Sequence, residues 1–168
     1  MLHELLAGAA KTMASVPYCW LVTTASDGVH ARPMGRIPPE AGEDALTVRF
    51  LTDDRSRKAA EIRRDGAVTA IFENQASDAY VAVTGRATLQ EDRSEVRRRW
   101  KRGYDVYFPS DDDRAHAAFV EVAIERLELW IRGVTPEPFG MKTTVVERDG
   151  DGWRPARSDR PEMPQGEC

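Results

Sequence analysis

The chain has 168 residues, of which 41% are hydrophobic, and a formal net charge of -4. This length and apolar content suit a single domain with a buried core. The slightly acidic balance argues against broad binding to nucleic-acid backbones, and no apolar run approaches the ~20 residues that cross a bilayer. We therefore expect neither a nucleic-acid partner nor a membrane partner.

The cysteines, the histidines and the first residues bear on metals and localisation. Cys19 falls in a predicted strand and Cys168 ends a polar tail, so the two have no metal-binding or redox spacing. The three histidines have no zinc-ligand spacing either. The start Met1-Leu2-His3-Glu4 lacks the basic and then apolar pattern of a signal peptide. These features predict a reduced, cytoplasmic protein without a metal site.

Hydrophobic spacing predicts the elements in chain order. Apolar residues at helical intervals predict a helix over 2–13, which Pro17 ends, and shorter helices over 56–64 and 92–100, the last with Asp92 as N-cap. Segment 103–113 shows no periodicity and is predicted to be irregular. Alternating, β-branched and aromatic runs predict strands over 18–24, 29–37, 46–52, 68–72, 80–89 and 119–131, and a last hairpin over 139–153.

Two irregularities are predicted within these strands. Gly85 stands inside the strand 80–89 and indicates a bulge or a tight bend. In the strand 119–131, apolar residues fall on even positions up to Ile124 and on odd positions from Leu127, which predicts a bulge near 125–126. This slip leaves Trp130 on the face away from the core, as an interface anchor or a wall against a ligand.

Six or seven antiparallel strands at short spacing, with helices between them, predict a mainly β protein. The expected architecture is an antiparallel β-barrel with peripheral helices. We treat residues 1–153 as one domain, because no linker or repeat divides them. Residues 154–168 are rich in proline and charge, so we expect a disordered C-terminal tail there.

The segment 50–58 is the strongest candidate for binding an anion. An apolar strand ends in this segment and a helix begins near Ser56. Helix starts leave backbone N–H groups unpaired and carry partial positive charge, so they hold phosphate readily. Arg57 and Lys58 add formal charge, and the hydroxyls of Thr52 and Ser56 add donors. The alternative is a helix start that is merely solvated.

Arg32 is a second candidate, on the strand 29–37. Pro33 cannot donate to a sheet ladder, so this strand is expected at an edge or beside a bulge. Arg32 belongs to the even, polar positions of the strand and would project away from the core, toward a cleft or a partner. A solvated arginine on an edge strand is the simpler alternative.

Three pieces in this order resemble a known family: Ala31-Arg32-Pro33-Met34, then 50–62 with Ser56-Arg57-Lys58, then 80–87. The chain is similar to the pyridoxamine 5'-phosphate oxidase-like FMN-binding split barrels, and most of all to their general stress protein branch. Trp100, Tyr107-Phe108-Pro109 and Leu129-Trp130 add support, so that the resemblance spans residues 16–131.

The resemblance implies a six- to seven-stranded split barrel that forms a homodimer with FMN at the subunit interface. Arg32 would lie beside the flavin ring, where a cation stabilises negative charge on the reduced ring. Trp130 would reach the flavin from the second subunit. No side chain is expected to be catalytic in itself. The implied cofactor-binding residues are Arg32, Pro33, Met34, Leu51, Thr52, Ser56, Arg57, Lys58, Tyr80 and Trp130.

The function that the resemblance implies is an FMN-dependent oxidoreductase that takes electrons from NAD(P)H or a small organic donor. Segment 139–144 lacks the basic, histidine-containing end that binds substrate phosphate in pyridoxamine phosphate oxidases, so we do not expect that activity. The alternatives are a flavin-binding stress protein without turnover, a reductase that uses coenzyme F420 (a deazaflavin), and an interaction module. FAD is an alternative cofactor.

Overall fold

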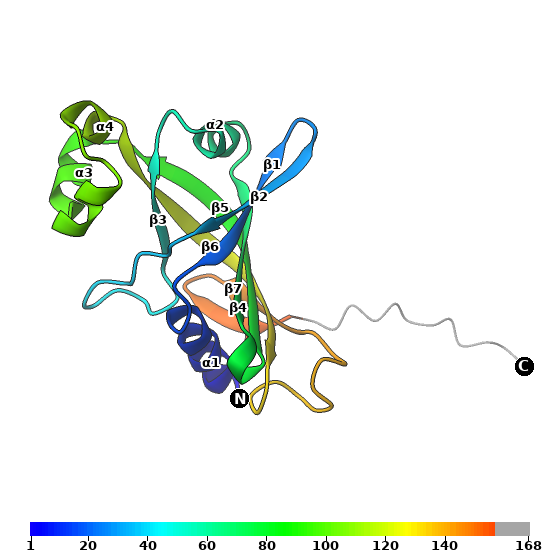
Figure 1. Ribbon diagram of the computed structural model, residues 1–168. Helices are drawn as coiled ribbons and strands as arrows, with labels where there is room; N and C mark the ends of the chain where they lie inside the picture. Colours follow the sequence, from blue (N-terminus) through cyan, green and yellow to red (C-terminus); the bar gives the residue numbers. More distant parts are fainter. Residues whose placement is uncertain (157–168) are drawn as a thin grey trace, which may run out of the picture.

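The fold is built from antiparallel strands and short helices, seen here in a computed structural model that describes residues 1–156 (Figure 1). The strands are β1 (Cys19–Ala25), β2 (Gly28–Met34), β3 (Val48–Asp53), β4 (Ala67–Asn74), β5 (Ala79–Gln90), β6 (Ala117–Ile131), β7 (Thr144–Asp149) and β8 (Gly152–Pro155). The helices are α1 (Leu2–Ala14), α2 (Arg57–Arg64), α3 (Arg93–Arg99), α4 (Asp111–Ala115) and the 3-10 turns η1 (Gln75–Ser77) and η2 (Arg102–Val106).

All eight strands belong to one sheet of a split β-barrel, in the order β2-β1-β4-β5-β6-β7-β8, with β3 paired to β6. The prediction of a mainly β split barrel is confirmed, but the strands number eight rather than six or seven, since the last hairpin adds both β7 and β8 to the sheet. Arg154 and Pro155 belong to that strand, so the paired chain extends beyond position 153. The rest of the expected tail, 157–168, lies outside the described residues.

The two predicted bulges are one feature, shared by β5 and β6. Thr84 lies opposite Arg126 and Gly85 lies opposite Ile124, so Glu125 has no partner in the ladder. The bulge near 125–126 is therefore confirmed, and Gly85 faces it across the sheet. A Cβ atom on Gly85 would lie 2.1 Å from the carbonyl oxygen of Ala123, so only glycine allows the strands to approach this closely.

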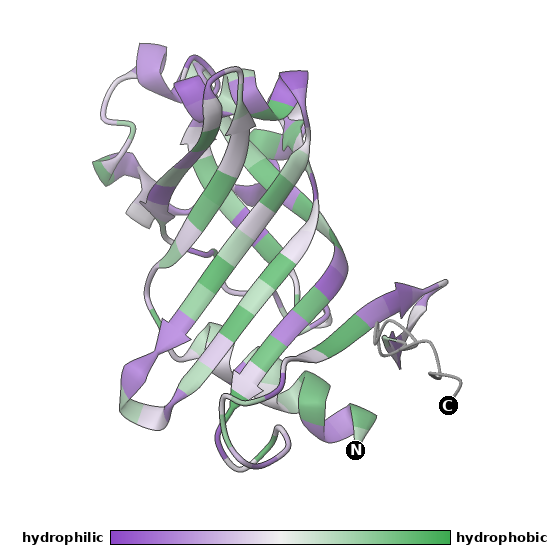
Figure 2. Ribbon diagram, turned by 90° about the vertical axis from the view of Figure 1, so that its right-hand side faces the viewer, coloured by the Kyte–Doolittle hydropathy of each residue, from purple (hydrophilic) through white to green (hydrophobic). Residues whose placement is uncertain are grey.

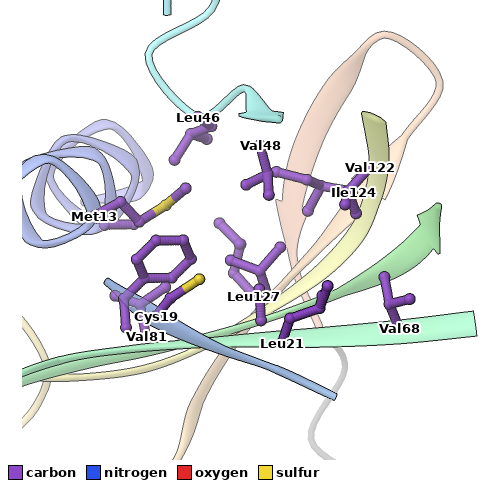
Figure 3. Packing of buried hydrophobic residues seen from close by; sticks show 14 of the residues in the cluster. Met13, Cys19, Leu21, Leu46, Val48, Val68, Val81, Val122, Ile124 and Leu127 are labelled. Carbon is purple, nitrogen blue, oxygen red and sulfur yellow. The ribbon is translucent and has the colours of Figure 1, made fainter. Parts of the chain in front are cut away.

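The main core fills the barrel and α1 closes one end of it, while α2, α3 and α4 lie at the other end (Figure 1). The strands alternate apolar and polar residues along their length, as Figure 2 shows. Met13 of α1 points among the strand side chains, in the cluster that includes Cys19 and Val81 (Figure 3). No helix within residues 1–156 is both long and apolar enough to span a bilayer.

A smaller core cluster joins α3 and η2 to the barrel. It centres on the buried Phe108 and Phe119, with Val96 of α3 packed beside them. The prediction that 103–113 is irregular is wrong. The segment holds η2 and α4, and α4 begins at a capping box in which Ser110 and Asp113 satisfy each other's backbone N–H groups. Elements this short give no hydrophobic period, because the caps and the aromatic cluster stabilise them.

Candidate functional site

A cleft of about 550 Å³ opens where the ends of β2 and β3, the start of α2 and the segment from η2 to α4 meet. Its size lies within the range of roughly 300–1,000 Å³ that is usual for small-molecule sites. The cleft contains half of the predicted cofactor-binding residues: Pro33, Met34, Leu51, Thr52 and Lys58.

The predicted anion corner is formed at the junction of β3 and α2. Ser56 is the N-cap of α2, and its Oγ accepts the N–H of Ala59 at 3.3 Å. The same Oγ lies 3.3 Å from Oγ1 of Thr52, which lines the cleft. Arg57 and Lys58 occupy the first two helical positions, where a backbone N–H has no acceptor within its own helix. The corner therefore combines hydroxyl groups with free N–H donors.

Lys58 brings the charge of this corner into the cleft. Its side chain is half-buried, and no carboxylate of residues 1–156 lies within 4.0 Å of its ammonium group. Burial lowers the pKa of Lys58, and the nearby charge of Arg32 lowers it further. The more distant charges of Asp53 and Glu61 act in the opposite direction. An anion in the cleft would favour the charged ammonium further, so Lys58 is suited to bind one.

Arg32 lies elsewhere than predicted. Its Nη1 donates to Oγ1 of Thr23 at 2.5 Å, and its Nη2 donates to Oε2 of Glu61 at 2.9 Å. The expectation that Arg32 projects away from the core toward a cleft or a partner is wrong as to the cleft, because the buried carboxylate of Glu61 on α2 holds its guanidinium. Arg32 does not contribute to the lining of the 550 Å³ cleft.

Glu61 is the centre of this network. Its carboxylate, 7% exposed, accepts from Thr23 at 2.5 Å, from Nδ1 of His30 and from Arg32. Burial alone would raise the pKa of Glu61, but these donors outweigh it and lower the pKa to about 2. Glu61 also lies 3.7 Å from Nε of Arg57, whose side chain is 75% exposed. Arg57 lines a separate depression, together with His30 and Glu61, rather than the cleft.

The Glu61 network predicts that the stability of the fold decreases in acid. The pKa of Glu61 in the folded protein, about 2, is below its ordinary value of 4.5. The ionised carboxylate therefore stabilises the fold above pH 4.5, and this stabilisation is lost as the pH falls toward 2. We expect the urea midpoint of the wild type to fall over this range more steeply than that of Glu61→Gln. Glu125→Gln, on an exposed side chain, is the matched control and should follow the wild type. Equal slopes for the wild type and Glu61→Gln would contradict the assignment.

Tyr80 and Trp130 are brought together, but outside the cleft. They lie opposite each other on β5 and β6, and both are half-buried. The neighbours of Trp130 along the strand, Leu129 and Ile131, are buried, which confirms that Trp130 is on the face away from the core. Neither residue lines the cleft of its own chain.

Sequence reasoning missed ten residues that line the cleft. Arg36 occupies an even position, like Arg32 and Met34. It lies beyond the end of β2, however, where side chains no longer alternate between two faces. Tyr104, Tyr107 and Phe108 come from the segment that was expected to be irregular, and only Tyr107 and Phe108 were cited, as support for the resemblance. The missed residues are Tyr18, Gly35, Arg36, Ile37, Pro38, Asp53, Tyr104, Tyr107, Phe108 and Asp113.

Comparisons with known proteins agree with this architecture. The model of a family described as "Pyridoxamine 5'-phosphate oxidase like" matches residues 6–148. A comparison with curated protein sequences gives no match.

Solved structures share the fold at low sequence identity. A Clostridium acetobutylicum protein related to general stress protein 26 has a TM-score of 0.69 and 15% identity, over 86% of this chain and 94% of the other. General stress protein 26 of Bacillus anthracis has a TM-score of 0.61 and 16% identity, over 75% and 93%. A pyridoxamine 5'-phosphate oxidase-related, FMN-binding protein of Nostoc punctiforme has a TM-score of 0.63 and 15% identity, over 90% and 93%.

Proposed function

Because the chain belongs to the pyridoxamine 5'-phosphate oxidase-like family, we propose that it is a flavoprotein that holds FMN in the cleft at the start of α2. The observation that carries this proposal is Lys58, a half-buried cation in the cleft with no carboxylate partner among the described residues. The FMN-binding relative from Nostoc punctiforme, which shares the fold, adds support.

The residues of the cleft fit a flavin at both ends. Lys58, the hydroxyl of Thr52 and the free N–H groups of α2 would hold the phosphate. Apolar and aromatic side chains, among them Met34 and Leu51, would pack against the flat ring. Once bound, FMN would supply reversible transfer of electrons, which the side chains that line the cleft do not offer.

We also propose that the protein is an oxidoreductase, with NAD(P)H or a small organic molecule as the electron donor. The side chains would bind and orient the flavin and the electron donor and would exclude water, and none would act as a nucleophile. Glu61 already neutralises Arg32, so the unpaired charge of Lys58 would take the larger share of phosphate binding.

A second copy of the chain is the proposed partner. Trp20 of β1 lies opposite Ile71 of β4, and their exposures of 49% and 38% are high for such large apolar side chains. On the same sheet, Tyr80 lies opposite Trp130, with both rings half-buried on the outer face. Apolar side chains on neighbouring strands make a surface that a homodimer would cover. The partner's copy of this surface would then contribute to the flavin site.

One preparation tests these proposals. We expect the purified protein to be yellow, to release FMN on heating as identified by mass spectrometry, and to sediment at twice the mass of one chain. Anaerobic addition of NADH or NADPH should bleach the flavin. A colourless protein that does not bind added FMN would contradict the proposed function, and release of a deazaflavin or FAD would change the cofactor. A flavin that neither nucleotide reduces would favour a carrier, and a single-chain mass would exclude the dimer.

A further inference from the structure

The ring of His30 lies between two carboxylates that come from different parts of the chain. Its Nδ1 is hydrogen-bonded to Oε1 of Glu61 on α2, and its Nε2 lies 3.1 Å from Oδ1 of Asp27, in the turn between β1 and β2. The tip of this hairpin stands beside α2 (Figure 1). The imidazole of His30 therefore connects the turn to the helix.

Only the doubly protonated ring can donate to both carboxylates. An ionised carboxylate accepts hydrogen bonds and has none to donate, whereas a neutral imidazole carries a single N–H. The imidazolium has an N–H on each nitrogen, so it satisfies Asp27 and Glu61 together. In the neutral ring, one nitrogen presents a lone pair to a carboxylate oxygen, and that contact is lost.

The contact with Asp27 is the one that a neutral ring would give up. The Glu61 side chain is only 7% exposed, and its pKa of about 2 keeps it ionised between pH 5 and 8. A buried acceptor that loses its donor costs more than an exposed one. The Asp27 side chain is 75% exposed, so water can replace the ring as its donor. Loss of one proton therefore leaves the bond to Glu61 intact and frees Asp27.

The charges around His30 oppose one another. Three guanidinium groups disfavour the imidazolium and two carboxylates favour it. These five side chains are Arg32, Arg57, Arg64, Asp27 and Glu61. The other two charged residues of α2 face elsewhere, since Lys58 lines the cleft and Arg63 pairs with Glu91. The side chain of His30 is 23% exposed in a depression of about 510 Å³, so the ring can exchange protons with solvent.

The movement that follows the loss of this contact is confined to the turn. Nη2 of Arg64 donates to the carbonyl oxygen of Thr24 at 2.9 Å, and this bond ties α2 to β1 in either state of the ring. The ladder of β1 and β2 continues up to Ala25, which lies opposite Gly28. Ser26 and Asp27 lie beyond the ladder, so they are the residues free to move.

We propose that His30 is a pH-sensitive latch between the β1–β2 turn and α2. The protonated ring holds Asp27 against Glu61, and the neutral ring releases the turn and opens the depression that the two elements enclose. Histidine ordinarily changes its charge between about pH 5 and 8, so the latch works near neutral pH. The inference does not depend on a flavin, because His30, Asp27 and Glu61 do not line the cleft.

NMR relaxation of the full chain between pH 5 and 8 tests the latch. We expect the order parameter of the Ser26 amide to fall from about 0.85 to below 0.6 as the pH rises, with the same midpoint as the ring signals of His30. Asp27→Asn should abolish this response, because an amide can donate or accept and so suits either state of the ring. Asp54→Asn is the matched control. It alters the other histidine–carboxylate pair, 2.9 Å from His116, and should leave the response of Ser26 unchanged.

Three results would overturn the latch. One is a turn that is equally ordered at pH 5 and pH 8, and another is a pH response that persists in Asp27→Asn. The third is a response whose midpoint follows the ring of His116 instead of the ring of His30. Asp27 is exposed, so its substitution should not prevent folding. None of these measurements requires bound flavin, so a failure of the flavoprotein assignment leaves the latch untouched.

Discussion

Replacing Lys58 with Met is expected to weaken FMN binding tenfold or more and to change riboflavin binding less than threefold. Riboflavin has the same ring but no phosphate, so the comparison isolates the charge at the start of α2. Losing one hydrogen bond to a charged group costs about 1.5–3 kcal/mol, and each 1.4 kcal/mol is tenfold in affinity. Fluorescence titration of the apoprotein with both ligands measures the two affinities.

Arg57→Met is the matched control for Lys58→Met, because the two side chains are neighbours on α2. Arg57 is 75% exposed and leans toward Glu61, so we expect its loss to weaken FMN by less than threefold. Replacing both residues with Ala should weaken FMN at least tenfold, with most of the loss due to Lys58. The phosphate must lie elsewhere if Lys58→Met weakens riboflavin and FMN equally.

Gly85→Ala is expected to destabilise the fold by about 3 kcal/mol or more, or to prevent folding, because it overfills a packed site. The new Cβ would lie 2.1 Å from the carbonyl oxygen of Ala123 and 3.0 Å from Cα of Ile124. Both are backbone atoms of β6, so relief requires β5 and β6 to separate at the bulge. Urea unfolding followed by tryptophan fluorescence measures the loss.

Gly103→Ala controls for the general effect of replacing a glycine. A Cβ at Gly103 would meet no atom within 4 Å, so we expect a change within about 0.5 kcal/mol. Equal stability of the two variants would mean that the strands do not approach each other so closely at Gly85.

Local sequence patterns predicted several features of the fold and of the site. The parity slip in β6 placed the bulge at Glu125, since each step of a strand alternates faces and an inserted residue must shift the pattern. The sequence predicts Asp92 as an N-cap because a short polar side chain before a helical run satisfies its first N–H groups, and Asp92 does so here. Ser56, predicted as the first residue of its helix, is also an N-cap. The pattern of segment 50–58 also predicted that Thr52 and Lys58 share one corner, and both line the cleft.

Contacts between distant segments could not be predicted in this way. Nothing near Arg32 in the sequence shows that Glu61, on another element, would hold its guanidinium. Arg36 was missed for a related reason, because its partners are backbone carbonyls of a loop, which any sequence would present. The aromatic wall around Phe108 depends on tertiary packing against Trp100 and Phe119 rather than on a local period.

The pairing of β3 with β6 determines when, during synthesis of the chain, the cleft can first form. Thr52, in the floor of the cleft, is held by a ladder partner, Ala118, that is translated far later. A chain emerging from the ribosome thus exposes the corner between β3 and α2 well before the strand that fixes it. Capture of the proposed flavin would therefore be a late event in biosynthesis, after β6 has left the exit tunnel and docked.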